Sequence, residues 1–239
     1  MICKMCGQNK KLIDAHIIPR CFFEQIKAGD KFLEVRSNIP NTYRSKSYIG
    51  FYDNSLVCLD CEKLFQEWDD YGCRLLLEKI TEKNFIKDLN NKRIGYTKEI
   101  DYKKLKLFFI SILWRADQSS RKEFSKIRTG PFERKLKEMI IDKDPGDKDT
   151  FSIYLSRFMD SFGLRAGIMS PFSRKAGGIN NYVFYMGSGY KMHIKVDKRP
   201  FNYPFSGLIL RPDSPLVVLI EDEFTKSKDF LAIAEFLRK

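Results

Sequence analysis

The sequence predicts an α+β protein whose N-terminal part is stapled by a metal ion. Two C-x-x-C pairs, Cys3 with Cys6 and Cys58 with Cys61, have the spacing of paired metal-binding knuckles. Apolar residues recur at helical spacing after the second pair, and strand-like stretches with turn residues between them occupy the C-terminal part. With 239 residues, of which 43% are hydrophobic and 31% charged, the chain can build a core and is neither collagen-like nor disordered.

The first 61 residues are rich in turn-formers and predict only short strands, over 12–18 and 55–58, around a polar loop at 28–48. A helix is expected from Glu62 to about Ile80. Its packing face is formed by Leu64, Phe65, Trp68, Leu75 and Leu76. Its other face carries Glu62, Gln66, Asp69 and Cys73, at i, i+4, i+7 and i+11, and is therefore the face that can hold chemistry.

Beyond a polar stretch near 84–97, three helices are expected. Asp101 is a good N-cap for a deeply buried helix through Leu105 to Trp114. Gly130-Pro131 begins the second helix, which ends before the turn at 144–147. The third helix is predicted by an amphipathic stripe of Phe151, Tyr154, Leu155, Phe158 and Phe162.

Antiparallel strands are expected to follow these helices. The strands 182–186 and 190–196 flank Gly187-Ser188-Gly189 as a hairpin, and two more are predicted over 208–210 and 216–220. A helix over 229–237 closes the chain. The sequence is thus divided into an N-terminal module, residues 1–82, and a basic α+β domain, residues 98–239.

The four knuckle cysteines predict a tetrahedral Cys₄ zinc site with a structural role, because two-residue spacers let each turn direct both thiolates at one ion. A redox C-x-x-C pair and an iron–sulfur cluster are the alternatives, and the absence of a thioredoxin-like βαβ context disfavours the redox reading. Cys21 and Cys73 are left over and are expected to pack as ordinary buried residues.

The formal net charge of +12 predicts a polyanionic partner, such as nucleic acid or an anionic membrane face. Residues 103–137 alone carry a net +8. No stretch interleaves aromatic and basic residues as a single-strand stacking platform would. We expect backbone phosphate contacts from Arg20, Lys103, Lys104, Lys106, Arg121, Lys122, Lys126 and Arg128.

No apolar run is long enough to cross a bilayer, and the N-terminus lacks the charged and apolar regions of a signal peptide. The expected location is the cytoplasm, with no membrane partner.

The two histidines are expected to differ in role. His16 lies between the knuckles, with Asp53-Asn54 before the second one and Glu62 just after Cys61. His193 falls on the polar face of a predicted strand with Lys191 and Lys195, where it would be exposed or touch phosphate.

Over about residues 1–75 this arrangement resembles the HNH endonucleases, the ββα-metal nucleases with zinc knuckles. Ala15-His16-Ile17-Ile18-Pro19 matches the motif of their first strand, Asn54 the second motif, and Glu62 the beginning of the third. The chain is also similar to an uncharacterised bacterial HNH-like branch with a Ser/Ala-His-Ile-Ile-Pro motif and a C-x-x-C-E helix.

The resemblance implies that His16 is the general base and that Asn54 holds the loop that orients it. It also implies one divalent cation, Mg²⁺ or Mn²⁺, with Glu62 as its helix ligand and Asp69 as a direct or water-mediated contact. The sequence departs from the family at Ala15, where the family has a metal ligand. The ion would then rest on Glu62 with Asp69 or Asp53, a partner would supply a ligand, or the site would be degenerate.

These observations favour a metal-dependent endonuclease that cuts DNA in preference to RNA, the preference for DNA resting on the resemblance alone. The first alternative is a catalytically degenerate, zinc-stabilised nucleic-acid-binding protein. The second is an interaction module, such as one subunit of a bacterial defence system, that docks an acidic partner. A regulatory protein partner or a homo-oligomer fits any of them.

Overall fold

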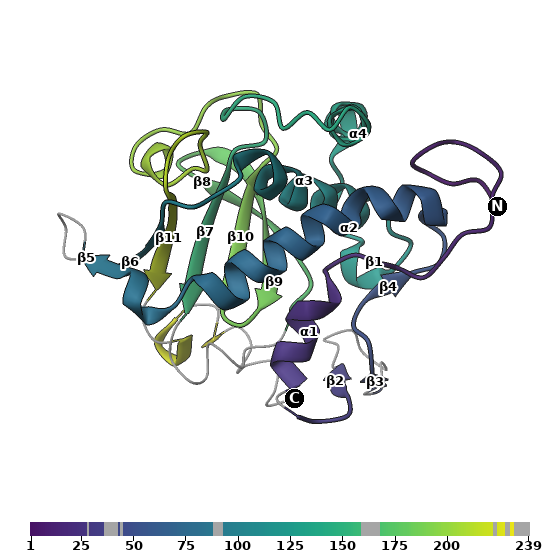
Figure 1. Cartoon of the computed structure of the whole chain (residues 1–239), viewed down its shortest axis with the longest axis horizontal. Coiled ribbons are helices and arrows are strands. Elements are labelled where there is room, and N and C mark those ends of the chain that lie inside the picture. Colours follow the sequence, from purple (N-terminus) through teal and green to yellow (C-terminus); the bar gives the residue numbers. More distant parts are fainter. Residues whose placement is uncertain are drawn as a thin grey trace.

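The computed structural model describes residues 1–27, 29–35, 43, 45–87, 93–158, 168–221, 224–227 and 230–231. Within them the chain is α+β, as predicted, with helices on one side of a large twisted sheet (Figure 1). None of the described helices is both long and apolar enough to cross a membrane.

The large sheet has seven strands in the order β5-β6-β11-β7-β10-β9-β8. Neighbouring strands are antiparallel except β11 and β7, which run parallel at the centre. The strands are β5 (Phe85–Lys87), β6 (Arg93–Thr97), β7 (Ile153–Phe158), β8 (Phe172–Ala176), β9 (Ile179–Gly187), β10 (Tyr190–Lys195) and β11 (Leu216–Glu221).

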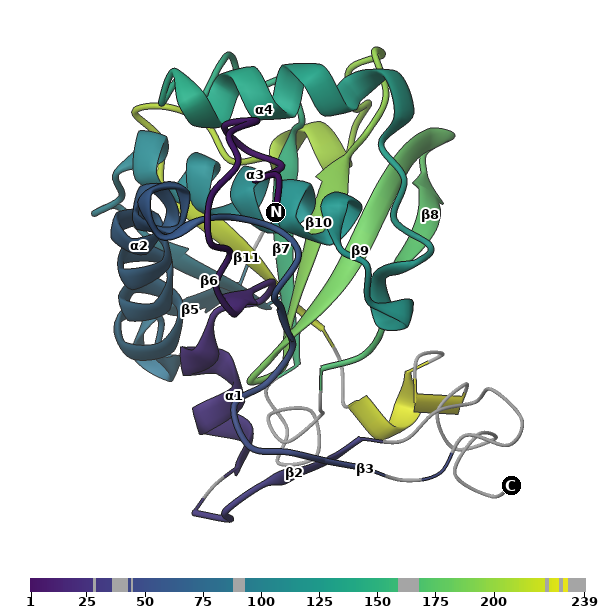
Figure 2. The same cartoon turned by 90° about the vertical axis from the view of Figure 1, so that its right-hand side faces the viewer.

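Two smaller antiparallel pairs, both formed by the first 53 residues, lie outside this sheet. Figure 2 shows one of them, labelled β2 and β3, below the large sheet. One joins β1 (Ala15–His16) to β4 (Tyr52–Asp53), and the other joins β2 (Leu33–Val35) to β3 (Ser45–Ser47).

The described α-helices are α1 (Arg20–Lys27), α2 (Leu59–Arg74), α3 (Tyr102–Gln118) and α4 (Glu133–Ile141), and a π-helical turn, Leu75–Lys79, extends α2. Short 3₁₀ helices span Glu82–Asn84, Lys122–Phe124, Gly130–Phe132, Phe205–Gly207 and Phe224–Lys226.

Helix α3 is the central element. It contacts α2, α4 and β10, and its residues from Leu105 to Ala116 are all buried. The predicted N-cap is confirmed, because the Asp101 carboxylate accepts a hydrogen bond of 3.0 Å from the Lys104 amide. A helix that is buried on all sides is mostly apolar on all sides, which explains the largely apolar run from Leu107 to Trp114.

The predicted helices around α2, α3 and α4, the β9–β10 hairpin and the strand at 216–220 are confirmed. The predicted helix at 151–162 was wrong: β7 occupies 153–158, and residues 159–162 lie outside the described part. Because β7 sits between two strands with both faces covered, apolar side chains on both faces imitate a helical stripe.

Other boundaries also differ from the prediction. Residues 208–210 form a turn rather than a strand, and α1, β5 and β6 lie where loops or short strands were expected. The predicted polar loop at 28–48 includes the strands β2 and β3, and most of the predicted last helix, 229–237, lies outside the described residues.

The prediction for His193 was also wrong. His193, Lys191 and Lys195 are each at most 3% exposed, because the face of β10 that carries them is covered. His193 stacks on Tyr154 with ring centroids 4.2 Å apart, and its Nε2 lies 3.2 Å from the Ser156 hydroxyl.

One hydrophobic core connects the two predicted parts of the chain. It runs without interruption from Cys3 and Phe65 through Trp114 to Leu155 and Val218. The segments 1–82 and 98–239 therefore share their interior, and α2 packs directly on α3.

Candidate functional site

The four knuckle cysteines come together at one point. Their sulfur atoms all lie within 4.8 Å of one another. Cys58 directly precedes α2 and Cys61 lies in its first turn, while the Cys3 carbonyl accepts a hydrogen bond of 2.8 Å from the Gly7 amide and closes the first knuckle. The cluster could hold a metal ion such as zinc.

Backbone amides favour negative charge on this cluster. The Cys58 amide donates to the Cys3 sulfur at 3.4 Å. Burial raises the pKa of Cys3, but hydrogen bonds from the Cys6 and Cys58 amides outweigh it and bring this pKa down to about 7. Burial and the neighbouring sulfur atoms raise the pKa of Cys61.

His16 lies at the end of β1, opposite Tyr52 of β4, and α2 follows these two strands in the chain. Its Nε2 is 3.0 Å from the Ile49 carbonyl oxygen, which can only accept, so Nε2 carries the proton and Nδ1 carries the lone pair. Burial lowers the pKa of His16, and the charges of Arg115 and Arg20 lower it further. The imidazole is therefore neutral at pH 7 and has the form that a general base needs.

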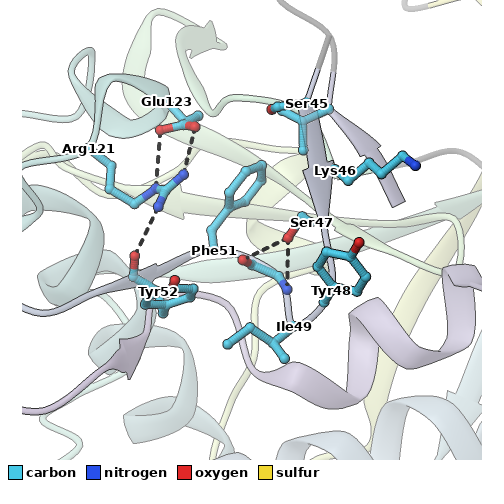
Figure 3. A pocket seen from close by; sticks show the side chains of 11 residues that line it. Ser45, Lys46, Ser47, Tyr48, Ile49, Phe51, Tyr52, Arg121 and Glu123 are labelled. Carbon is cyan, nitrogen blue, oxygen red and sulfur yellow. Dashed lines mark hydrogen bonds and ion pairs between the residues drawn. The ribbon is translucent and has the colours of Figure 1, made fainter. Parts of the chain in front are cut away.

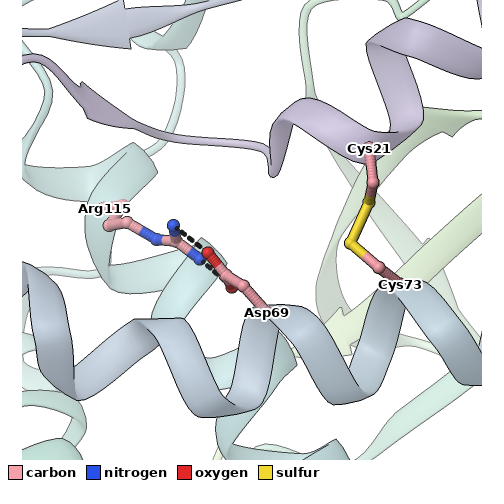
Figure 4. Close-up of a disulfide and its surroundings, with 4 residues drawn as sticks. All are labelled: Cys21, Asp69, Cys73 and Arg115. Atoms are coloured by element: carbon pink, nitrogen blue, oxygen red, sulfur yellow. Dashed lines mark hydrogen bonds and ion pairs between the residues drawn. A yellow bond between two sulfur atoms is a disulfide. The ribbon is translucent and has the colours of Figure 1, made fainter.

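Arg115 of α3 holds the two sides of this site together. Its guanidinium is fully buried and forms a bidentate ion pair with Asp69 of α2, at 2.7 and 2.8 Å (Figure 4). It also donates to the His16 carbonyl at 2.8 Å and to the carbonyl and hydroxyl of Ser111. All five N–H donors of Arg115 are thereby used inside the protein.

The predicted cation ligands lie close to this arginine but differ in availability. One carboxylate oxygen of Glu62 is buried and has no hydrogen-bond partner among the described residues, and burial raises the pKa of Glu62. Both oxygens of Asp69 accept from Arg115, so Asp69 is primarily an ion-pair partner rather than a free ligand.

The loop before α2 is held by Asp53, whereas the side chain of Asn54 is exposed. The buried Asp53 carboxylate accepts hydrogen bonds from the amides and hydroxyls of Ser55 and Ser120 and from the hydroxyl of Ser119. The anchoring role that the resemblance implies for Asn54 therefore falls to its neighbour.

A pocket of about 380 Å³ is lined by β3, by the residues that follow it and by Arg121 and Glu123 (Figure 3). Ile49, which holds the imidazole, and Tyr52, which pairs with His16 across the strands, both line it. The rest of the lining comes from Val35, the segment 45–51, Arg121 and Glu123.

The predicted phosphate-contacting residues are placed unevenly. Lys106 was predicted wrongly, because it is 1% exposed and donates to the Asp147 carbonyl and the Tyr102 hydroxyl. Three others form ion pairs: Arg20 with Glu24, Lys104 with Glu67, and Arg121 with Glu123. The side chains of Lys103, Lys122, Lys126 and Arg128 are exposed.

The remaining two cysteines were predicted to be ordinary packing residues, and this prediction was wrong, because they form a disulfide. Cys21 at the beginning of α1 is joined to Cys73 at the end of α2, with 6.2 Å between their Cα atoms (Figure 4). The bond connects the helix that follows His16 to the helix that carries Glu62 and Asp69.

Sequence reasoning missed Arg115 and the anchoring role of Asp53. Arg115 was counted only as one charge in a basic stretch, and its contacts with His16 lie 99 residues away in the chain. The one available signal was a charged residue inside an apolar helix, since a buried arginine must have a partner.

No protein-family model, curated protein or solved structure matches this chain. The site is therefore interpreted from its own geometry.

Proposed function

We propose that the protein is a metal-dependent endonuclease that hydrolyses phosphodiester bonds in DNA, with His16 as the general base. The observation that carries this proposal is the state of the His16 imidazole. The Ile49 carbonyl holds its Nε2 proton, and the pKa of His16 is lowered, so that Nδ1 has a lone pair at neutral pH.

In this reaction Nδ1 takes a proton from a water molecule as the water oxygen attacks phosphorus. The bond from phosphorus to the leaving oxygen breaks, and the leaving oxygen takes a proton from solvent water. Arg115 fixes the backbone of the base by donating to the His16 carbonyl. The net charge of +12 attracts the polyanionic substrate.

The donor set fits two different metals. The four cysteine sulfurs suit a structural Zn²⁺. The unpartnered oxygen of Glu62 suits a hard cation such as Mg²⁺ or Mn²⁺, with Asp69 beside it through electron pairs that Arg115 leaves free. When bound, this cation would stabilise negative charge on the phosphate group.

The proposal is tested by cleavage of plasmid and single-stranded DNA in Mg²⁺, Mn²⁺ or EDTA. Wild type should cut only with a divalent cation. His16→Ala should lower the cutting rate by at least about 100-fold because it removes the general base, and Glu62→Gln should lower it by a similar factor because it removes a charged ligand of the cation. Lys148→Ala, which removes an exposed cation outside the site, should cut normally. Thermal unfolding of each variant checks that it is folded.

A second candidate is a zinc-stabilised nucleic-acid-binding protein that does not cut. It is favoured by the bidentate pair between Asp69 and Arg115 and by Ala15, which offers no ligand. Salt-sensitive binding without cutting in any of the metals would select this candidate and overturn the first.

A further inference from the structure

The pocket next to His16 combines aromatic and cationic groups, which the mechanism above does not use. Its lining includes Tyr48 and Tyr52 together with Lys46 and Arg121. Tyr48, which directly follows β3, is 57% exposed although its ring is large and apolar. We propose that this pocket binds one unpaired nucleotide of the substrate strand, with the base against Tyr48 and a phosphate on Arg121 and Lys46.

The aromatic wall is preformed. Tyr48 packs edge-on against Phe32 with ring centroids 5.9 Å apart, and the Lys46 ammonium lies 4.2 Å from the centre of the same Phe32 ring. The Ser47 hydroxyl donates to the Gly50 carbonyl and accepts from the Gly50 amide, which fixes the turn that follows Tyr48. An exposed and positioned ring offers a face on which any base can stack.

Arg121 supplies the group for a phosphate. It donates two bonds to Glu123 and one to the Tyr52 carbonyl, so two of its five N–H donors have no partner among the described residues. Its side chain is 31% exposed, and its guanidinium lies 5.3 Å from the Phe51 ring at the base of the pocket. A guanidinium with spare donors and one open side is suited to a phosphate oxygen.

The size and place of the pocket select the ligand class. About 380 Å³ is at the small end of ligand pockets, so one nucleotide fits and a stacked duplex does not. Ile49 and Tyr52 belong both to the pocket and to the surroundings of His16. A nucleotide bound in the pocket would therefore place its neighbouring phosphodiester at the imidazole of His16. The proposal that this nucleotide belongs to the substrate rests on the proposed function, and it specifies the substrate as unpaired nucleic acid.

The test is fluorescence anisotropy of a labelled 12-nucleotide single strand, and of the same sequence as a duplex. The titrations use the whole 239-residue chain in buffer without divalent cations. Wild type should bind the single strand more tightly than the duplex. Tyr48→Ala should weaken single-strand binding by roughly tenfold or more, because the variant loses the ring on which the base stacks. Its duplex binding should change less than about twofold.

Two variants serve as controls. Tyr48→Phe keeps the ring and should bind as wild type does, whereas Tyr203→Ala removes a still more exposed tyrosine outside the pocket and should have no effect. Photo-crosslinking of a 5-iodouracil strand, followed by peptide mapping, should label the segment 45–52. Unfolding curves show whether Tyr48→Ala is folded, and the crosslink tests the pocket without any substitution.

Unchanged single-strand binding by Tyr48→Ala, or a crosslink only elsewhere, would overturn the proposal. Adenosine monophosphate tests whether the ligand is a free nucleotide. If it displaces the labelled oligonucleotide at an equal concentration, the proposal that the pocket binds a nucleotide within a nucleic-acid strand is also overturned. A wild-type protein that binds single strands through Tyr48 but never cuts would contradict the nuclease and leave the pocket in place.

Discussion

At the scale of single residues, Asp53 is the best example of a side chain whose charge is part of the structure. Burial alone would raise its pKa, but the bonds from Ser55, Ser120 and Ser119 outweigh burial and hold the pKa well below its usual range. The ionised form thus fastens the loop between β4 and α2 to the end of α3.

Asp53→Asn is expected to destabilise the protein by about 2–4 kcal/mol near pH 7, because several donors lose a charged acceptor. The folded pKa is depressed, so this contribution is complete above the unfolded pKa of about 4 and is lost as the pH falls below it. Urea unfolding between pH 3 and pH 7 should show wild type and variant converging toward acid. Asp14→Asn, which alters an exposed carboxylate, is the control, and a gap independent of pH would contradict this account.

The pair formed by Arg115 and Asp69 makes a second prediction at this scale. Arg115→Met or Asp69→Leu should each cost about 3–5 kcal/mol, because each leaves its partner as a buried unpaired charge. The double variant should recover part of this loss, but not all, since the His16 carbonyl also loses its donor. A double-mutant cycle by urea unfolding measures the coupling, and strictly additive losses would show that the two charges do not interact.

The sequence predicted residues of the site well where local spacing determines them. The two C-x-x-C pairs identified all four cluster cysteines, since a knuckle is a local turn. The sequence could not identify Asp53 rather than Asn54 as the residue that holds the loop, nor the ion pair of Asp69. Both depend on contacts with α3 or with the serines directly after it, more than 40 residues away in the chain.

At the scale of elements, the same contrast holds. Capped and periodic helices were predicted closely, as Asp101 and α3 show. The central strand β7 was not, because a strand buried on both faces has no alternation of polar and apolar residues. Residues 45–48 fall in the predicted polar loop at 28–48, although the pairing of β3 with β2 places Lys46, and Tyr48 directly after it, in the lining of the pocket.

The disulfide makes an element-scale prediction, because it joins the ends of α1 and α2 across 52 residues. Replacing both Cys21 and Cys73 by Ser should lower the free energy of unfolding by about 2–4 kcal/mol, as expected for a loop of this length. Thiol titration of the denatured protein should give four free thiols before reduction and six after it. Six thiols before reduction would contradict the bond.

The four knuckle cysteines bring together another pair of elements, the N-terminal turn and the beginning of α2. The purified protein should hold about one zinc per chain, and strong chelation should lower its thermal midpoint by an amount on the order of 10 °C, because metal binding energy is folding energy. Cys58→Ser should lose the metal, whereas the Cys21/Cys73 double variant should keep it. Absence of zinc in both the wild type and its reconstituted form would contradict the assignment.

At the scale of the whole molecule, the site belongs to both parts of the chain. The His16 side comes from β1, the carboxylates from α2, and the arginine that joins them from α3. The hydrophobic core likewise takes residues from both parts of the chain. Phe65 of α2, for example, packs on Trp114 of α3 with ring centroids 6.2 Å apart. Neither the motif around His16 nor the two C-x-x-C pairs indicated this dependence, because motifs describe local segments.

We therefore expect that residues 1–82, produced alone with zinc, do not form the native site. Without α3 the apolar face of α2 is exposed, Asp69 has no counter-ion and the His16 carbonyl has no donor. Amide NMR spectra of this fragment should lack the dispersion of a folded protein, apart from signals near the bound metal. Adding residues 98–239 in trans should not restore them unless the fragments associate, and the full chain is the control. A well-dispersed spectrum, with His16 titrating as it does in the full chain, would show instead that the N-terminal part folds on its own and that α3 only covers it.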